Sequence, residues 1–154
     1  MTSITDLISP GLVSTDLAAT SAAEAIDELA GLLEADGRVN DRARYVEAVL
    51  TREQETGGTG MGSGIAIPHA KTDAVTRAAV AFGKSTRGID FGSEDGAASD
   101  LVFLIAAPEG DDDLHVRVLS RLARRLIHDS FRTALREADS PEDLVGIMQR
   151  EVEL

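Results

Sequence analysis

Residues 57–69 read GGTGMGSGIAIPH, so a glycine-rich loop leads into a short apolar run that ends on a histidine. The run Ile65-Ala66-Ile67 predicts a short buried strand, and Pro68 suits the end of a strand because it cannot donate to the hydrogen-bond ladder. Glycine N–H groups can converge on an anion, since no Cβ stands in the way. The stretch therefore predicts that the imidazole of His69 lies at a sheet edge, beside a loop able to hold phosphate.

This arrangement is typical of a histidine that accepts a phosphoryl group. Neutral imidazole is a good nucleophile near pH 7, and the phosphoramidate that it forms transfers its phosphoryl group readily. The alternative is a flexible surface loop followed by a structural histidine, because glycine-rich loops are common. If the loop does hold phosphate, its candidate residues are Thr59, Gly60, Gly62, Ser63 and Gly64.

Two further side chains are candidates for the same site. His115 falls in the first turn of an expected helix, where the helix end favours an anion and an uncharged imidazole, on a stripe with Leu119, Leu122 and Leu126. Arg52 precedes the glycine loop, and its guanidinium fork matches two phosphoryl oxygens. The alternatives are a core histidine bonded to a carbonyl and an arginine in a surface ion pair. His128 is expected on the polar face of its helix and has no predicted role.

Composition narrows the class of protein. The 154 residues carry a net charge of −12, and 43% of them are hydrophobic. This length predicts one domain, residues 1–154, with its own core. The acidic balance argues against nucleic acid or an anionic membrane as the main partner, since both require basic patches. The apolar runs are too short to span a membrane and the amino terminus has no signal-like segment, so we expect a cytoplasmic protein.

Four helices are predicted from caps and apolar spacing. The first follows a capping box at 21–24 and runs to about residue 34. The aspartates at 111–113 are expected to begin the longest helix, which ends near residue 127. Ser140 and Pro141 are expected to begin the last one. The second runs from about 41 to 55, with a buried stripe formed by Ala43, Val46, Val49 and Leu50.

Strands are predicted at 65–67, at 78–82 and at 101–107. The last of these is apolar on both faces, as in a central strand that helices cover from both sides. Strands mixed with helices and one evident core predict a single α/β domain whose sheet is flanked by helices on both faces. The order of the strands cannot be read from the pattern.

These residues resemble the enzyme IIA domain of the bacterial phosphoenolpyruvate-dependent sugar phosphotransferase system, of the fructose/mannitol type. The resemblance extends from about Ile4 to Met148. The ordered segments that carry it are Arg52-Glu53, residues 59–69 (TGMGSGIAIPH), residues 88–91 (GIDF), residues 101–108 (LVFLIAAP), and His115 with residues 119–123 (LSRLA).

The resemblance implies a mixed sheet, phosphorylation of His69 on Nε2, and a phosphate site lined by His115 and Arg52. It also implies a phosphoryl donor, the carrier HPr, and an acceptor, a cysteine of enzyme IIB, which loads the sugar during transport by the membrane enzyme IIC. No metal or other cofactor is expected. The sequence departs from the family pattern at Gly58, where many members carry a serine.

The 154 residues contain no cysteine, so the IIB nucleophile is expected on a separate chain. Residues 88–92 (GIDFG) and 106–110 (AAPEG) favour the fructose branch of the family. One alternative is the nitrogen-type IIA, a regulator phosphorylated on the same histidine. Another is a binding module in which the histidines hold a metal, although no familiar ligand spacing surrounds them.

Overall fold

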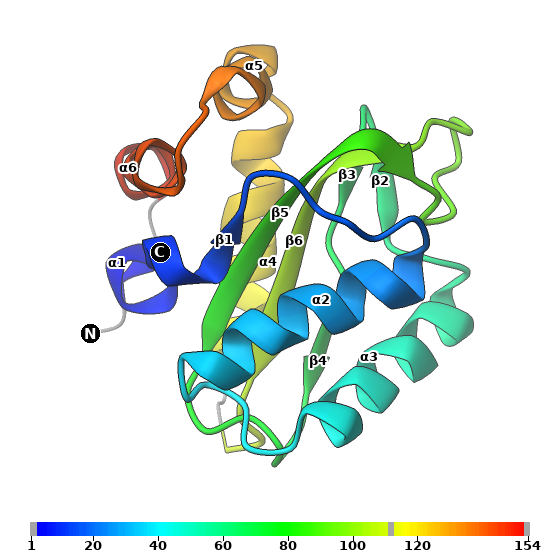
Figure 1. Ribbon diagram of the computed structural model, residues 1–154, viewed down its shortest axis with the longest axis vertical. Coiled ribbons are helices and arrows are strands. Elements are labelled where there is room, and N and C mark those ends of the chain that lie inside the picture. Colours follow the sequence, from blue (N-terminus) through cyan, green and yellow to red (C-terminus); the bar gives the residue numbers. More distant parts are fainter. Residues whose placement is uncertain (1–2, 111–112, 153–154) are drawn as a thin grey trace.

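A computed structural model describes residues 3–110 and 113–152, which form one mixed sheet with helices on both faces (Figure 1). The predicted single α/β domain with a mixed, helix-flanked sheet is confirmed. The helices are α1 (Ile4–Leu7), the 3₁₀ turn η1 (Pro10–Leu12), α2 (Ala22–Ala35), α3 (Arg42–Thr56), α4 (Leu114–Leu126), α5 (Asp129–Glu137) and α6 (Pro141–Glu151).

The sheet has six strands in the order β1-β5-β6-β3-β2, and β4 also pairs with β6. The β5–β6 and β2–β3 pairs are antiparallel, whereas β1 pairs parallel with β5, and β3 and β4 pair parallel with β6. The strands are β1 (Val13–Ser14), β2 (Gly60–Gly62), β3 (Ile65–Ala66), β4 (His69–Lys71), β5 (Ala79–Ile89) and β6 (Ser99–Ala107).

Strands β3 and β4 lie along the same edge of β6 in one continuous register. Ile65 is opposite Leu101, and His69 is opposite Ile105, so the spacing is four residues on both strands. Pro68 separates β3 from β4, because it has no N–H to donate, although its carbonyl still accepts from the Ile105 N–H at 3.0 Å. His69 is thereby the first residue of β4, a strand that was not predicted, and not a residue that follows the end of a strand.

Strand β6 is the centre of the fold, with a separate hydrophobic cluster on each of its faces. Leu101, Phe103 and Ile105 pack with α1, α4, α5 and α6, whereas Val102, Leu104 and Ala106 pack with α2 and α3. Figure 1 shows α2 and α3 in front of the sheet and α4 behind it. The apolar character of 101–107 on both faces is therefore explained as predicted, by helices on both sides.

The predicted helix caps at Ser21 and Ser140 are confirmed, with one change. The Ser21 hydroxyl accepts from the Glu24 N–H at 3.2 Å, and Ser140 accepts from the Asp143 N–H at 3.1 Å. The Glu24 carboxylate accepts from the N–H of Thr20, the residue before Ser21, at 3.0 Å. In a standard capping box this carboxylate accepts from the N–H of the N-cap residue, whereas here the residue before it donates.

Three helix predictions were wrong. The buried stripe of α3 does not include Ala43, which is exposed. Tyr45 is fully buried instead, because its hydroxyl donates to the Ile105 carbonyl at 2.9 Å. The longest helix is α3, with 15 residues, and not α4, which has 13. Helix α5 was missed, since its nine residues follow α4 after only two intervening positions.

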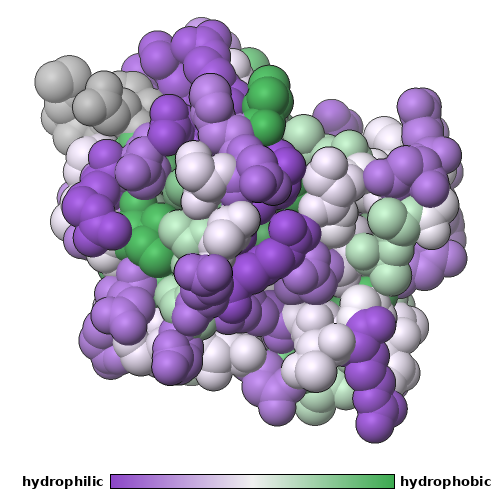
Figure 2. Space-filling model, turned by 90° about the horizontal axis from the view of Figure 1, so that it is seen from above, coloured by the Kyte–Doolittle hydropathy of each residue, from purple (hydrophilic) through white to green (hydrophobic). Residues whose placement is uncertain are grey.

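The predicted aspartate cap of α4 lies partly outside the described residues, which exclude Asp111 and Asp112. Asp113 is the N-cap residue and makes no side-chain capping bond. In the described part of the chain, no helix combines the length and apolar character that crossing a bilayer requires. Figure 2 shows mainly hydrophilic residues on the face that it presents, with hydrophobic residues in small patches.

Candidate functional site

The ring of His69 is held from its own main chain. Its Nδ1 atom lies 2.9 Å from the carbonyl oxygen of Ile67. A carbonyl oxygen can only accept, so Nδ1 carries a proton, and in the neutral ring the lone pair is then on Nε2. The neutral tautomer present is therefore the one in which Nε2 can attack an electrophile.

Arg52 contacts the other nitrogen of the same ring. Its Nε atom lies 3.4 Å from Nε2 of His69, and since a guanidinium is always a donor, Nε2 accepts. Arg52 belongs to the C-terminal half of α3, which packs against β4. Both contacts of the ring are thus satisfied by one neutral tautomer, and the contact to Nε2 is long for a hydrogen bond.

A cavity of about 610 Å³ brings the three predicted site residues together. His69 enters it from β4, Arg52 from α3, and His115 from the first turn of α4. Its lining holds three cationic side chains against two carboxylates, although the chain as a whole is strongly acidic. The lining residues are Arg44, Glu47, Ala48, Thr51, Arg52, Glu55, His69, Ala70, Lys71, Thr72 and His115.

The glycine loop is arranged differently from the simple cradle that the sequence suggested. Residues 60–66 form a hairpin, β2 with β3, whose turn is Ser63-Gly64. Two of its N–H groups are already bonded: that of Gly60 to the Phe91 carbonyl at 2.9 Å, and that of Ser63 to Asp95 at 3.1 Å. Among the described residues, the cavity lining includes none of Thr59, Gly60, Gly62, Ser63 and Gly64. Phosphate binding by these five stays a prediction.

Close packing gives a second reason for the glycines. A Cβ on Gly58 would lie 2.1 Å from the carbonyl oxygen of Phe91, and the φ angle of Gly58 is +107°. A Cβ on Gly60 would lie 2.2 Å from the Ser93 hydroxyl. Backbone meets backbone between this loop and residues 91–93, so only glycine fits. A serine at position 58 would therefore not fit this backbone.

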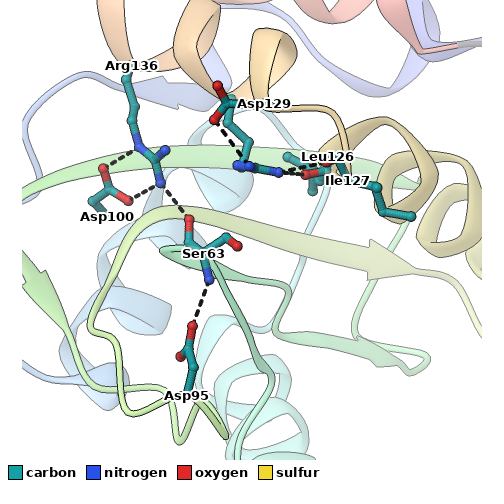
Figure 3. A network of polar contacts seen from close by, with 8 residues as sticks. Ser63, Asp95, Asp100, Leu126, Ile127, Asp129 and Arg136 are labelled. Atoms are coloured by element: carbon teal, nitrogen blue, oxygen red, sulfur yellow. Dashed lines mark hydrogen bonds and ion pairs between the residues drawn. The ribbon is translucent and has the colours of Figure 1, made fainter.

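Arg136 anchors the turn of this hairpin to the C-terminal helices (Figure 3). Its guanidinium donates to both carboxylate oxygens of Asp100, at 2.8 and 2.9 Å, and to the carbonyl of Ser63 at 2.7 Å. The pair with Asp100 raises the pKa of Arg136 above its usual value. The turn is thus held by α5 on one side and by Asp95 on the other.

The sequence reading assigned no role to Glu53, which lies next to Arg52. The Thr59 hydroxyl donates to its carboxylate. Burial raises the pKa of Glu53, while the hydrogen bonds from Thr59 act in the opposite direction. The spacing of residues along the helix could not reveal the bond between Glu53 and Thr59. Neighbouring helix positions point about 100° apart, so the position of Arg52 does not indicate what Glu53 contacts.

No metal was expected from the sequence. In residues 3–110 and 113–152, no three side chains of His, Asp or Glu converge as metal ligands would. His128 is exposed and is the N-cap residue of α5, outside the cavity lining.

The chain belongs to the family "Phosphoenolpyruvate-dependent sugar phosphotransferase system, EIIA 2", whose model matches residues 6–151. This confirms the membership expected from the sequence and makes the protein a phosphotransferase component, an EIIA phosphocarrier of the fructose/mannitol family.

Two curated relatives are fructose-specific components. The EIIA component of Haloferax volcanii is 43% identical over 129 residues, which cover 84% of this chain and 83% of the relative. The EIIABC component of Bacillus subtilis is 41% identical over 147 residues, 96% of this chain. This chain spans only 23% of that longer relative.

Two solved structures share the fold over nearly the whole chain. The nitrogen regulatory protein IIA-Ntr from Neisseria meningitidis aligns with a TM-score of 0.85 and 29% identity, over 93% of this chain and 97% of that one. The mannitol enzyme IIA of Escherichia coli, solved in complex with phosphorylated enzyme IIB, aligns with a TM-score of 0.78 and 27% identity, over 92% and 96%.

Proposed function

We propose that this protein accepts a phosphoryl group from phospho-HPr on Nε2 of His69 and passes it to the cysteine of an enzyme IIB during fructose uptake. One observation carries the proposal. The Ile67 carbonyl holds the proton on Nδ1, which leaves the Nε2 lone pair beside Arg52 in a cavity that also receives His115.

The chemistry balances without a further reactant. The Nε2 lone pair attacks phosphorus, the P–N bond of the donor phosphohistidine breaks, and its electron pair returns to the donor ring. His69 then carries a proton on Nδ1 and phosphorus on Nε2, so its ring bears a positive charge that the Ile67 carbonyl stabilises. In the second step a thiolate attacks phosphorus, and the electron pair of the broken P–N bond returns to Nε2.

Arg52 and His115 act on the phosphoryl oxygens. In a loose, in-line transfer the protein mainly positions the group and stabilises charge on its equatorial oxygens. Arg52 exchanges its long contact with Nε2 for these oxygens, and His115 donates from the other wall of the cavity. By analogy with oxyanion holes, losing one such donor costs about 2–4 kcal/mol of transition-state stabilisation.

Similarity to relatives supports the partners. Both curated relatives described above are fructose-specific, and the mannitol enzyme IIA with the same fold binds phosphorylated enzyme IIB. Because the sequence has no cysteine, the accepting thiolate comes from outside these 154 residues. The enzyme IIC that moves the sugar is then reached only through enzyme IIB.

A second function is favoured by one observation, the close structural match to IIA-Ntr. A nitrogen-type protein would take phosphate on the same histidine and act on other proteins by its phosphorylation state. Membranes containing the cognate enzymes IIB and IIC separate the two functions. Phosphorylated protein that drives no fructose uptake, although His69 is labelled, would favour the regulator.

The direct test is labelling by phospho-HPr, followed by mass-spectrometric mapping of the modified residue. We expect one phosphoryl group on His69, and none on a folded His69→Ala variant. His128→Ala is the matched control, because His128 is exposed and outside the cavity, and it should label like wild type. Labelling of another residue in wild-type protein, or continued labelling of His69→Ala, would refute the assignment.

A further inference from the structure

Glu53 is bonded through both its side chain and its main chain to the loop that leads into β2. It is partly buried near the C-terminal end of α3. Its carboxylate accepts from the Thr59 hydroxyl, and its main-chain carbonyl accepts from the N–H of Gly58 at 2.9 Å. Side chain and main chain of one residue thus join helix α3 to the glycine loop.

The hydrogen bonds continue from Thr59 to the reactive ring. The carbonyl of Thr59 accepts from the Ile67 N–H at 3.2 Å, and the carbonyl of Ile67 accepts from Nδ1 of His69 at 2.9 Å. From the other side, Arg52 lies 3.4 Å from Nε2. The Glu53–Thr59 bond is therefore a second connection, besides the Arg52–His69 contact, between the helix that carries Arg52 and the segment that carries His69.

The Glu53 carboxylate is held by a hydroxyl and not by an ion pair in the described part of the chain. Within residues 3–110 and 113–152, the ion pairs include none with its carboxylate. Partial burial disfavours its charged form, and the hydroxyl of Thr59 is the principal group that opposes this cost. Burying the Glu53 carboxylate in this way contributes little to the stability of the fold. A role at the neighbouring His69 site explains the position of Glu53 better.

We propose that Glu53 is a positioning residue for phosphoryl transfer at His69, and that it acts through Thr59 to fix the His69 ring relative to the Arg52 guanidinium. The inference rests on the proposed function of His69. Glu53 itself does not touch the phosphoryl group. Because in-line transfer needs the reacting atoms aligned, a shift of about 1 Å between ring and guanidinium can slow the reaction by roughly a hundredfold.

A double-mutant cycle tests the link between the two residues. Thr59→Val, Glu53→Leu and the double variant are phosphorylated by phospho-HPr in single-turnover experiments. We expect each single variant to lower the maximal transfer rate about tenfold, with little change in the phospho-HPr concentration that gives half of that rate. The double variant should be no slower than the slower single variant, because both remove the same bond. Rates that simply multiply would overturn the proposal.

Conservative variants separate the hydrogen bond from the charge. Glu53→Gln keeps an acceptor oxygen and Thr59→Ser keeps the hydroxyl, so both should stay within about threefold of wild type. Glu53→Gln as slow as Glu53→Leu would overturn the proposal in favour of a purely electrostatic effect. If Glu53→Leu does not fold, the comparison of transfer rates between Thr59→Val and Thr59→Ser is the test. A Thr59→Val rate equal to that of wild type would overturn the proposal.

The chain offers a matched control for the loss of a threonine–carboxylate bond. Thr86 donates to Asp16 at 3.2 Å on the exposed end of β5, outside the cavity lining, and Thr86→Val should leave the rate unchanged. A second readout does not need transfer. The ¹H–¹⁵N signal of Nδ1–H in His69 should weaken in Thr59→Val as the ring becomes mobile. Absence of labelling in wild type would refute the proposed function, whereas normal labelling with unaffected variants would refute only the role of Glu53.

Discussion

The Ile67 carbonyl accepts the Nδ1 proton of His69 across a single intervening residue, Pro68. The proline ring restricts φ at this position, so the three residues have little freedom to rearrange. The tautomer of the imidazole is therefore set by the main chain, independently of a partner protein. Side-chain substitutions elsewhere cannot remove this main-chain acceptor, although they can shift the segment that carries it.

Arg52→Lys should impair phosphorylation although it keeps the positive charge. An ammonium cannot contact two phosphoryl oxygens in the plane of a fork, so we expect kcat/KM for phospho-HPr to fall about tenfold to a hundredfold. Arg42→Lys is the control, because Arg42 is on the same helix but pairs with the exposed Asp27. Stopped-flow labelling of both variants gives the comparison. Equal rates would mean that Arg52 has no role in phosphoryl transfer.

His115→Ala should slow transfer in both directions while leaving the attacking nitrogen intact. The lost donor is worth about 2–4 kcal/mol if it bonds the phosphoryl group in the transition state. The onward rate to the thiol of enzyme IIB should fall strongly, and rapid-quench measurements from phosphorylated protein report it. Unchanged forward and onward rates would leave His115 as a residue of the cavity wall only.

Gly58→Ala should destabilise the fold more than a glycine replacement at an open turn. Its Cβ would meet the Phe91 carbonyl oxygen at 2.1 Å, at a φ of +107°. Gly37→Ala, at a φ of +75° with no atom within 4 Å, carries only the backbone cost of about 1 kcal/mol. Urea unfolding should show a clearly greater loss of unfolding free energy for Gly58→Ala than for Gly37→Ala. Equal losses would mean that the loop at Gly58 can move away from residues 91–92 without cost.

Glu53 should give the protein a pH-dependent stability of known sign. Burial raises its folded-state pKa above the ordinary value of 4.5, so the native state binds this proton more tightly than the unfolded chain does. The contribution is fully present below pH 4.5 and is lost as the pH rises through the folded-state pKa. Relative to Glu53→Gln, the wild-type free energy of unfolding should therefore fall over this range. An equal or opposite slope in urea titrations at several pH values contradicts the assignment.

Much of the fold could be predicted because its signals are local. Both faces of 101–107 are apolar, which already required helices on two sides of the strand, and Ser140 with Pro141 marked the start of α6. Tyr45 shows where this failed. Tyrosine is a partly polar residue, but the Tyr45 hydroxyl donates to the carbonyl of Ile105, 60 residues away in the chain. Tyr45 is therefore buried, whereas Ala43 is exposed.

The sequence by itself predicted His69 as the phosphorylated residue that we propose, since a glycine loop, a short strand and Pro68-His69 adjoin one another in the chain. Only the tertiary structure decided what surrounds that residue. The parallel register of β4 on β6 and the packing of α3 beside β4 bring Arg52 and His115 to one cavity with His69. The same packing turned the glycines towards residues 91–93 and connected Glu53 to Thr59. Such contacts depend on how separate elements meet in space, and periodicity within one element carries no information about them.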